Sequence, residues 1–230
     1  MKIRELHAWP RMSTSEAKQL QLRLRELLVW DGGPASCALV AGGDGTYRVG
    51  QPTGRASAVI WSTEELTVVE RSFAERELTM PYIPGLFSFR EAPVLLEAFR
   101  GLRHTPDVVL LDGHGLAHPR RFGLACHVGL FLDLPTIGCA KSLLVGKHGD
   151  LASDEGATAP IVHEGEVVGA AVRTRRGCRP VYVSQGYRIS LARAIEIVLL
   201  CARGRRLPEP ARLAHLALQG ERTWSRPPAC

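Results

Sequence analysis

Four charged residues lie where predicted strands end or a predicted helix begins: Asp44, Glu91, Asp112 and Lys141. The two aspartates and the lysine each follow a short apolar run, and the glutamate opens a helical pattern between the aspartates. If the first and fourth strands of an α/β sheet pair in parallel, Asp44 and Asp112 lie side by side beyond their carboxyl ends, the edge where such sheets bind ligands. Glu91 can then reach the same point.

Three carboxylates at one point repel one another, and a hard divalent cation such as Mg²⁺, or Mn²⁺, compensates them. Such an ion can activate a water, orient a phosphate and stabilise a leaving oxygen, which is the chemistry of phosphodiester hydrolysis. Lys141 would add positive charge for the transition state. A single aspartate after a strand is more often a turn former or helix cap, so the prediction depends on the joint pattern.

The hydrophobic periodicity predicts an alternation of strands and helices around these residues. A capping box of Ser13 and Glu16 starts the first helix, Ser190 caps a later one, and Pro93 is expected in the first turn of the helix that Glu91 opens. The predicted helices are 14–30, one from 91, 122–132, 190–202 and 210–219, and the predicted strands are 37–41, 58–62, 66–73, 108–111, 136–140, 161–162, 167–172 and 181–184. This alternation predicts an α/β fold with parallel central strands.

Composition restricts the class of protein. The 230 residues are 45% hydrophobic and 23% charged, which is typical of a globular chain, and we expect a single domain and a monomer. The net charge of +6 favours an anionic partner such as nucleic acid, although its arginine bias can also reflect genome composition. Six cysteines without a CxxC pair, a charged N-terminus and no apolar run of membrane-span length predict a cytoplasmic protein with reduced thiols and no membrane partner.

Other catalytic motifs are missing from the sequence. The glycines between residues 42 and 50 lack the lysine and serine of a phosphate-binding P-loop. His163-Glu164 lacks the second histidine of a zincin, and no serine or cysteine has a nucleophile elbow.

Two longer strings are far more specific than these single residues. PYIPGLFSFRE (81–91) and DGHGLAHPRRFGLACHVGL (112–130) closely resemble the two most distinctive motifs of endonuclease V enzymes. VAGGDGTY (40–47), TIGCAKS (136–142) and VYVSQGYRISL (181–191) extend the similarity in the expected order. The resemblance covers roughly residues 14–205 and implies a ribonuclease H-like fold, a central mixed sheet flanked by helices, followed by a C-terminal helix at about 208–219 within one domain, 1–230.

The resemblance also implies a role for each matched residue. Asp44 and Asp112 are expected to be metal ligands, Glu91 to hold a metal or orient a metal-bound water, and Lys141 to stabilise the cleaved phosphate. The wedge that fills the gap left by an extruded base is expected at Pro81, Tyr82, Ile83 and Pro84, where a tyrosine between prolines offers a preset stacking surface. The residues expected around a hypoxanthine pocket are Gly85, Phe87, Gly113, Gly115, His118, Leu124 and Leu144.

Three histidines near these motifs have more than one interpretation. His118 would contact the base or the nucleic acid backbone, or it would simply pair with a backbone carbonyl before a helix. His114 and His127 are interpreted as structural, in a loop and on a buried helix face respectively.

The sequence departs from the family pattern at the last motif. Family members usually read Ser-Pro-Gly-His there, whereas this chain reads Ser184-Gln185-Gly186-Tyr187. We therefore expect Tyr187 at the catalytic position, where it can hold a water or phosphate oxygen but cannot replace imidazole as a proton carrier near neutral pH. Gly45 replaces a branched residue, and Phe87 replaces a smaller one that would leave the pocket wider.

The function that the resemblance implies is metal-dependent cleavage of DNA on the 3′ side of deoxyinosine or another deaminated purine, in DNA repair. Two alternatives remain open at this point. The chain would be a lesion-binding protein if Tyr187 marks decayed catalysis, although intact Asp44, Glu91, Asp112 and Lys141 argue against that. It would otherwise be a nuclease for inosine-containing RNA or for branched DNA.

Overall fold

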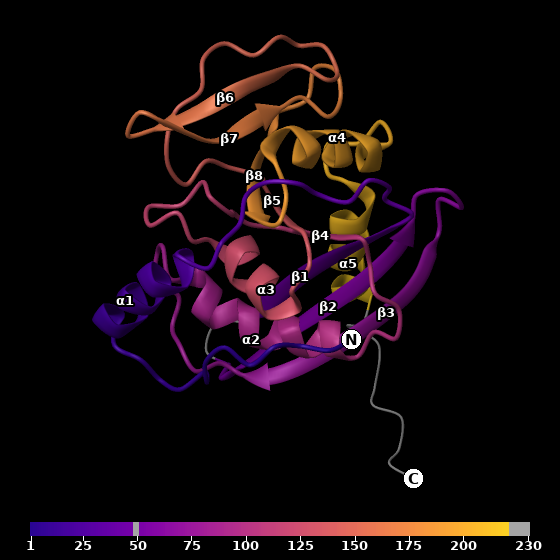
Figure 1. Ribbon diagram of the computed structural model, residues 1–230. Helices are drawn as coiled ribbons and strands as arrows, with labels where there is room; N and C mark the ends of the chain where they lie inside the picture. The colour runs from indigo at the N-terminus through magenta and orange to yellow at the C-terminus, as the bar shows by residue number, and fades with distance from the viewer. Residues whose placement is uncertain (48–50, 221–230) are drawn as a thin grey trace.

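A single mixed sheet runs through the computed structural model, which describes residues 1–47 and 51–220 (Figure 1). Its order is β3-β2-β1-β4-β5-β8-β7-β6. The strands are β1 (Leu39–Tyr47), β2 (Thr53–Ser62), β3 (Val68–Glu77), β4 (Val108–Leu111), β5 (Thr136–Ala140), β6 (Thr158–His163), β7 (Glu166–Val172) and β8 (Val181–Tyr187). The helices are α1 (Thr14–Arg25), α2 (Phe87–Arg100), α3 (Leu124–Leu132), α4 (Leu191–Ala202) and α5 (Glu209–Gly220).

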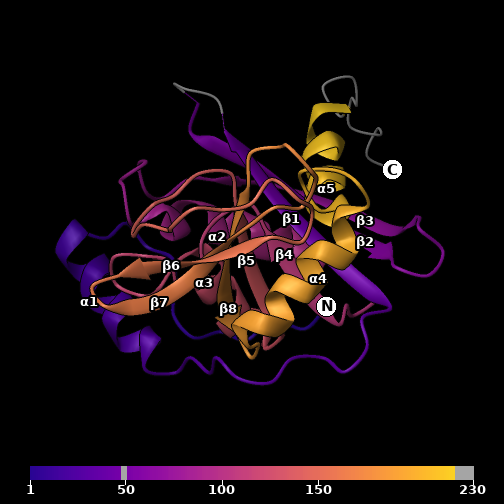
Figure 2. The ribbon, with the colours of Figure 1, turned by 90° about the horizontal axis from the view of Figure 1, so that it is seen from above.

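Helices cover both faces of this sheet. Strand β4 is buried throughout, and its alternating side chains divide between two cores: Val109 and Leu111 pack against α2 and α3, whereas Val108 and Leu110 pack on the side of α4. Figure 2 shows the yellow helices α4 and α5 on one side of the central strands and α1, α2 and α3 on the other. A four-residue run that is apolar at every position therefore forms a strand buried on both faces, as predicted.

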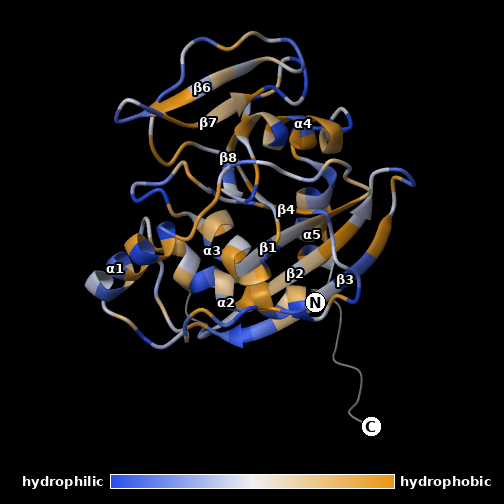
Figure 3. Ribbon diagram, viewed as in Figure 1, coloured by the Kyte–Doolittle hydropathy of each residue, from blue (hydrophilic) through white to orange (hydrophobic). Residues whose placement is uncertain are grey.

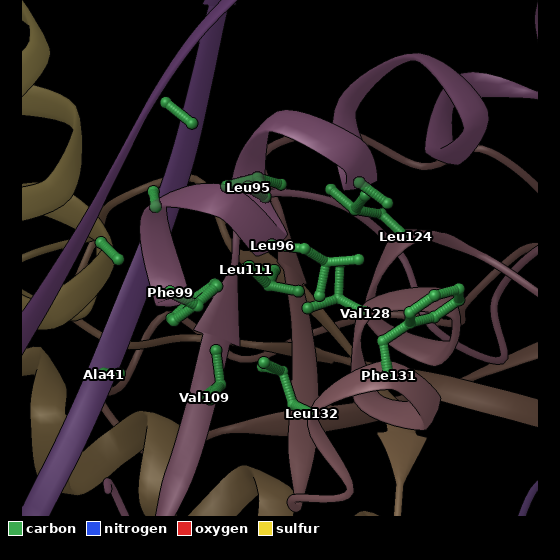
Figure 4. Close-up of a cluster of buried hydrophobic side chains, with 14 of the residues drawn as sticks. Ala41, Leu95, Leu96, Phe99, Val109, Leu111, Leu124, Val128, Phe131 and Leu132 are labelled. Atoms are coloured by element: carbon green, nitrogen blue, oxygen red, sulfur yellow. The ribbon is translucent and has the colours of Figure 1, made fainter. Parts of the chain in front are cut away.

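The larger core lies between the sheet and the pair α2 and α3. Phe99 of α2 and Val128 of α3 meet Leu111 of β4 in this layer, and these side chains interdigitate in Figure 4. Figure 3 shows hydrophobic colour concentrated along β2 and the turns of α2 that face it. None of the helices in the described ranges is both long and apolar enough to cross a membrane.

The central pairing brings the two aspartates to the same level of the sheet. Strand β1 pairs in parallel with β4, ending at Gly43 opposite Leu111, and β4 pairs in parallel with β5. Asp44 and Asp112 are the next residues on their strands. The predicted parallel centre and the juxtaposition of its two carboxyl ends are thus confirmed.

Strand β1 is longer than predicted. Gly42 and Gly43 suggested that it ended there, but it continues to Tyr47 and stays paired with β2, so Asp44 lies within a strand. The reason is close packing on both faces: a β-carbon on Gly42 would lie 2.0 Å from the Pro210 carbonyl oxygen, and one on Gly43 2.8 Å from a Leu111 methyl group. The glycines admit α5 and α2 rather than ending the strand.

Helix α2 begins earlier than predicted. It starts at Phe87, so Glu91 is its fifth residue and Pro93 lies in the helix interior instead of the first turn. Proline at this position has no N–H to donate to the Phe89 carbonyl. Burial of Leu95 and Phe99 in the core against the sheet, and of Phe89 against Met80 and Leu86, offsets that loss. The capping box of Ser13 and the N-cap of Ser190 are both confirmed, although α1 ends at Arg25.

Candidate active site

Asp44 and Asp112 open onto one cleft at the carboxyl end of the parallel strands. The cleft has a volume of about 790 Å³, and it is lined by both aspartates together with Lys141. The Asp44 side chain is 12% exposed and that of Asp112 29%, so Asp44 is the more deeply set of the two. The pKa of Asp44 is raised above its ordinary value. Burial is the largest cause, and the negative charge of Asp112 raises the pKa further.

Glu91 lies behind the aspartates, on the inner side of α2. Burial raises its pKa well above the ordinary carboxyl value, and the charges of Asp44 and Asp112 raise it further. A β-carbon on Gly45 would lie 3.3 Å from the carboxyl carbon of Glu91. Glycine at position 45 therefore leaves room beside the Glu91 carboxyl group.

Lys141 supplies positive charge beside the carboxylates. It follows β5, and its Nζ donates to Oδ2 of Asp112 in a short ion pair. The backbone carbonyl of Lys141 accepts a hydrogen bond from the guanidinium of Arg206, which also bonds the carbonyls of residues 179 and 180. The segment between α4 and α5 thus anchors the backbone that carries Lys141.

A histidine that the sequence did not reveal completes this group. His215 lies on α5, and its Nδ1 is 2.8 Å from Oδ2 of Asp44, while Gln219 hydrogen-bonds to its Nε2. This hydrogen bond lowers the pKa of Asp44, in opposition to the larger effect of burial. The helix itself was predicted, but no local pattern indicated that it packs against β1. The glycine at position 42, which admits the Pro210 backbone, was the only signal of that contact.

Tyr187 lies elsewhere, contrary to the prediction that it occupies the catalytic position. It pairs with Thr136 at the start of β5, whereas Lys141 follows the end of that strand. Its side chain is 5% exposed and packs with Leu24, Phe122 and their neighbours, and its hydroxyl approaches Asp133. Adjacent strands β5 and β8 run antiparallel, so the last residue of β8 is placed at the opposite end from the carboxylates.

A second, smaller cavity adjoins the cleft. Its volume is about 340 Å³, and it contains six of the seven residues predicted around the base: Gly85, Phe87, Gly113, His118, Leu124 and Leu144. Tyr82 also lines it. Asp112 and Lys141 line both the small cavity and the cleft, so the two spaces share a wall that carries charged groups.

Gly115 is the exception among the predicted pocket residues. It is absent from the lining of the small cavity, and a β-carbon there would lie 1.9 Å from the Gln185 carbonyl oxygen. Its N–H donates to the hydroxyl of Ser184. Gly115 therefore serves the close packing of its loop against β8 rather than the approach of a ligand.

His118 borders the small cavity while holding its backbone in place. Its Nε2 is 3.0 Å from the carbonyl oxygen of Gly85, which also accepts hydrogen bonds from Gln21 and Arg120. Burial, followed by the charge of Arg120, lowers the pKa of His118 to about 3, so its imidazole is neutral. Pairing with a carbonyl was one of the two predicted interpretations, and this contact fits it. His127 is fully buried, as predicted.

The predicted wedge projects at the rim of the small cavity. Tyr82 is 58% exposed and contacts the ring of Phe87 edge-on, with 6.0 Å between ring centroids. Pro81 is exposed as well, whereas Ile83 packs against the core formed by Met80, Leu86 and Phe89. Ile83 thus anchors a short segment whose aromatic ring stays open to solvent.

The donor groups of the cleft fit a hard divalent cation. Asp44, Glu91 and Asp112 offer only carboxylate oxygens, the donors that Mg²⁺ and Mn²⁺ prefer. The raised pKa values of Asp44 and Glu91 indicate a need for positive charge nearby. Among the residues described, no three such side chains form a ready-made coordination shell, and Lys141 and His215 instead each hold one aspartate oxygen.

Comparison with known proteins gives the family. The family model for endonuclease V matches residues 23–216. The chain belongs to the endonuclease V family. It is 48% identical to the endonuclease V of Dehalococcoides mccartyi strain BAV1 over 217 residues, which cover 94% of this chain and 97% of that protein.

Solved structures of endonuclease V share the fold. That of Streptomyces avermitilis superposes with a TM-score of 0.89 at 35% identity, covering 97% of this chain and 98% of the other. That of Ciona intestinalis, in complex with a 24mer DNA containing an inosine followed by a ribo-adenosine, gives 0.80 at 26% identity and covers 91% and 97%. The ribonuclease H-like fold predicted from the sequence is thus confirmed, and as an endonuclease V the chain is a metal-dependent nuclease that hydrolyses phosphodiester bonds.

Proposed function

We propose that this endonuclease V binds DNA carrying deoxyinosine, takes the extruded hypoxanthine into the small cavity, and cuts the strand on the 3′ side of the lesion with Mg²⁺. The observation that carries the proposal is the shared wall of the two spaces. Because Asp112 and Lys141 border both, a base held in the cavity leaves its own backbone phosphates beside the carboxylates. Recognition and cleavage then concern neighbouring atoms of one nucleotide.

The size and lining of the cavity support a flipped base as its occupant. Its exposed surface is largely apolar, with Phe87 and Leu124 on its walls, and the neutral His118 is one of the polar groups that line it. Tyr82 at the rim has the exposure that stacking on a neighbouring base needs. The complex of the Ciona intestinalis protein with inosine-containing DNA supports the same partner for this chain.

The residues at the cleft would have separate roles in cleavage of the phosphodiester bond. Asp44, Glu91 and Asp112 would hold Mg²⁺, which supplies Lewis-acid chemistry at the phosphate when bound. The Lys141 ammonium offers fixed positive charge to the phosphate oxygens. His215 orients the Asp44 carboxylate through their hydrogen bond, and its imidazole lies close enough to the cleft to move a proton.

We further propose that a single copy of the chain suffices and that it works in a reducing compartment such as the cytoplasm. One chain lines both the cleft and the cavity, which supports action as a monomer. The cysteines of the described residues are all free thiols, and most are buried. The alternative of a lesion-binding protein without activity was based on Tyr187. That basis is removed, because Tyr187 lies outside the cleft and His215 provides an imidazole within it.

A nicking assay tests the proposal. End-labelled duplexes with one deoxyinosine, one deoxyadenosine or an inosine ribonucleotide are incubated with Mg²⁺, Mn²⁺ or a chelator, alongside Asp44→Asn. We expect Mg²⁺-dependent cleavage 3′ to deoxyinosine by the wild type and none by the variant. Tight binding of the inosine duplex without cleavage in either metal would establish the binding protein, and cleavage of RNA alone would overturn the DNA assignment.

A further inference from the structure

A chain of three polar side chains leads from the surface to the small cavity. Nε2 of His7 lies 2.8 Å from Nε2 of His127, and Nδ1 of His127 lies 3.0 Å from the hydroxyl oxygen of Ser88. Ser88 is the second residue of α2 and lines the cavity proposed for the base. His127 is inaccessible to solvent, and the aromatic rings of Trp9, Phe89 and Phe131 pack around the two imidazoles.

The outer end of this chain determines its polarity. Nδ1 of His7 is 2.6 Å from the carbonyl oxygen of Ala8, which can only accept, so Nδ1 carries the proton. Burial lowers the pKa of His7 and of His127, so both imidazoles are neutral near pH 7. Nε2 of His7 is then an acceptor, and the proton between the two rings belongs to His127.

The direction of the hydrogen bond at the inner end, between His127 and Ser88, follows from the same proton positions. A neutral His127 that donates from Nε2 has a bare Nδ1, which accepts a hydrogen bond from the Ser88 hydroxyl. In the described part of the chain this is the hydroxyl's only hydrogen bond. Its single proton is thereby committed to His127, and the oxygen retains lone pairs without a partner in a cavity wall.

We propose that Ser88 is a specificity-determining residue that accepts a hydrogen bond from the N1–H of the bound base, held in the accepting state by His127 and His7. The inference rests on the proposed function of the small cavity. Hypoxanthine carries a proton on N1, whereas adenine presents a lone pair at the same atom. Once the base has displaced water from the cavity, two facing lone pairs are unfavourable, so adenine is rejected where hypoxanthine is bound.

The first test reads the proton positions and does not depend on DNA. Nitrogen chemical shifts of ¹⁵N-histidine-labelled protein at about pH 7.5 distinguish the two neutral tautomers of His127. We expect the form protonated on Nε2. A form protonated on Nδ1 would make Ser88 the acceptor of His127 and would overturn the proposal.

The second test measures which atoms of the base determine the affinity of the cavity. Fluorescence anisotropy in Ca²⁺ gives the affinity for duplexes with one deoxyinosine, deoxyadenosine or deoxynebularine, the last of which lacks both N1–H and O6. Ser88→Ala should weaken binding of deoxyinosine by about 3- to 10-fold, the effect of one hydrogen bond, and should leave binding of deoxynebularine unchanged or stronger, because the N1 lone pair of that base faces the same serine oxygen. Ser153→Ala, at an exposed bend, is the matched control.

A third test, at His7, concerns the chain of hydrogen bonds from His7 through His127 to Ser88, which we call the relay. His7→Ala should reduce the preference for deoxyinosine because His127 can then carry its proton on either nitrogen, whereas His7→Gln should restore it through an accepting side-chain carbonyl. Equal loss for deoxyinosine and deoxynebularine in Ser88→Ala, at an unchanged melting temperature, would refute the role of Ser88. A wild type that does not prefer deoxyinosine over deoxyadenosine would instead refute the proposed function, and the tautomer of His127 would still report on the relay.

Discussion

His215 donates from Nδ1 to Oδ2 of Asp44 across 2.8 Å, joining a terminal helix to the first strand of the sheet over 171 positions of sequence. The contact closes one side of the cleft and supplies the imidazole that the last motif was predicted to lack. It also bears on Asp44, because this hydrogen bond opposes the effect of burial on the pKa of the carboxyl group. His215 therefore lies beside Asp44 at the cleft, whereas Tyr187 lies at the opposite end of β5.

Replacing His215 should impair cleavage far more than replacing Tyr187. His215→Ala removes the hydrogen bond to Asp44 and a proton-carrying group, so we expect single-turnover cleavage of deoxyinosine DNA to slow by about 100-fold or more. Tyr187→Phe keeps the buried ring and loses only a contact with Asp133, so its rate should stay within about 2-fold of the wild type. The opposite ranking of the two rates would place the catalytic position at Tyr187.

The pKa of Glu91 predicts how stability changes with pH. Because the folded-state pKa lies above the ordinary value of 4.5, the folded protein keeps a proton that the unfolded chain loses, and stability falls as pH rises through that interval. In chelator, Glu91→Gln should therefore melt higher than the wild type near about pH 8, by an order of 1 kcal/mol or roughly 2 to 4 °C, with little difference near about pH 4. Calorimetry at the two pH values measures this.

The same variant separates stability from activity. Glu91→Gln lacks the charge that the cation needs, so it should show no Mg²⁺-dependent cleavage although it is more stable without metal. If Glu91→Gln melts lower than the wild type at the alkaline pH, that result would contradict an energetic penalty from the ionised carboxyl group.

The exposed ring of Tyr82 predicts a loss of affinity without loss of fold. Tyr82→Ala removes one stacking surface, worth about 1 to 3 kcal/mol, so deoxyinosine DNA should bind roughly 5- to 150-fold more weakly. Because the side chain is 58% exposed, the melting temperature should hardly change. Tyr82→Phe is the control, since it keeps the ring, and a large loss of affinity in that variant would assign the effect to the hydroxyl instead.

Two glycines of one loop should respond differently to a methyl group. In Gly115→Ala the new β-carbon would lie 1.9 Å from the backbone oxygen of Gln185, which cannot move without disturbing β8, so the protein should be strongly destabilised. In Gly113→Ala it would lie 3.3 Å from a methyl group of Leu124, whose side chain can shift. We expect Gly113→Ala to fold and to bind deoxyinosine more weakly. Melting curves measure the stability of the two variants, and fluorescence anisotropy measures their affinity for deoxyinosine DNA. A stable Gly115→Ala protein would contradict the packing role of Gly115 and favour its predicted place in the pocket.

Local pattern was enough to find much of this molecule. The run before Asp112, which is apolar at every position, indicated a strand buried on both faces, because only a two-sided core favours an apolar residue at every position. The parallel order of the central strands then brought Asp44 and Asp112 to one edge. Two short motifs added the family, the predicted wedge segment and six residues that line the small cavity.

The tertiary structure alone decided which residues meet across long sequence separations. The neighbours of α5 depend on which apolar faces pack together. Local periodicity predicts neither the contact of His215 with Asp44 nor the position of Tyr187 opposite the start of β5. The chain from His7 to Ser88 is of the same kind. Propensity and patterning act over a few residues, whereas packing of the whole core selects the partners of each side chain.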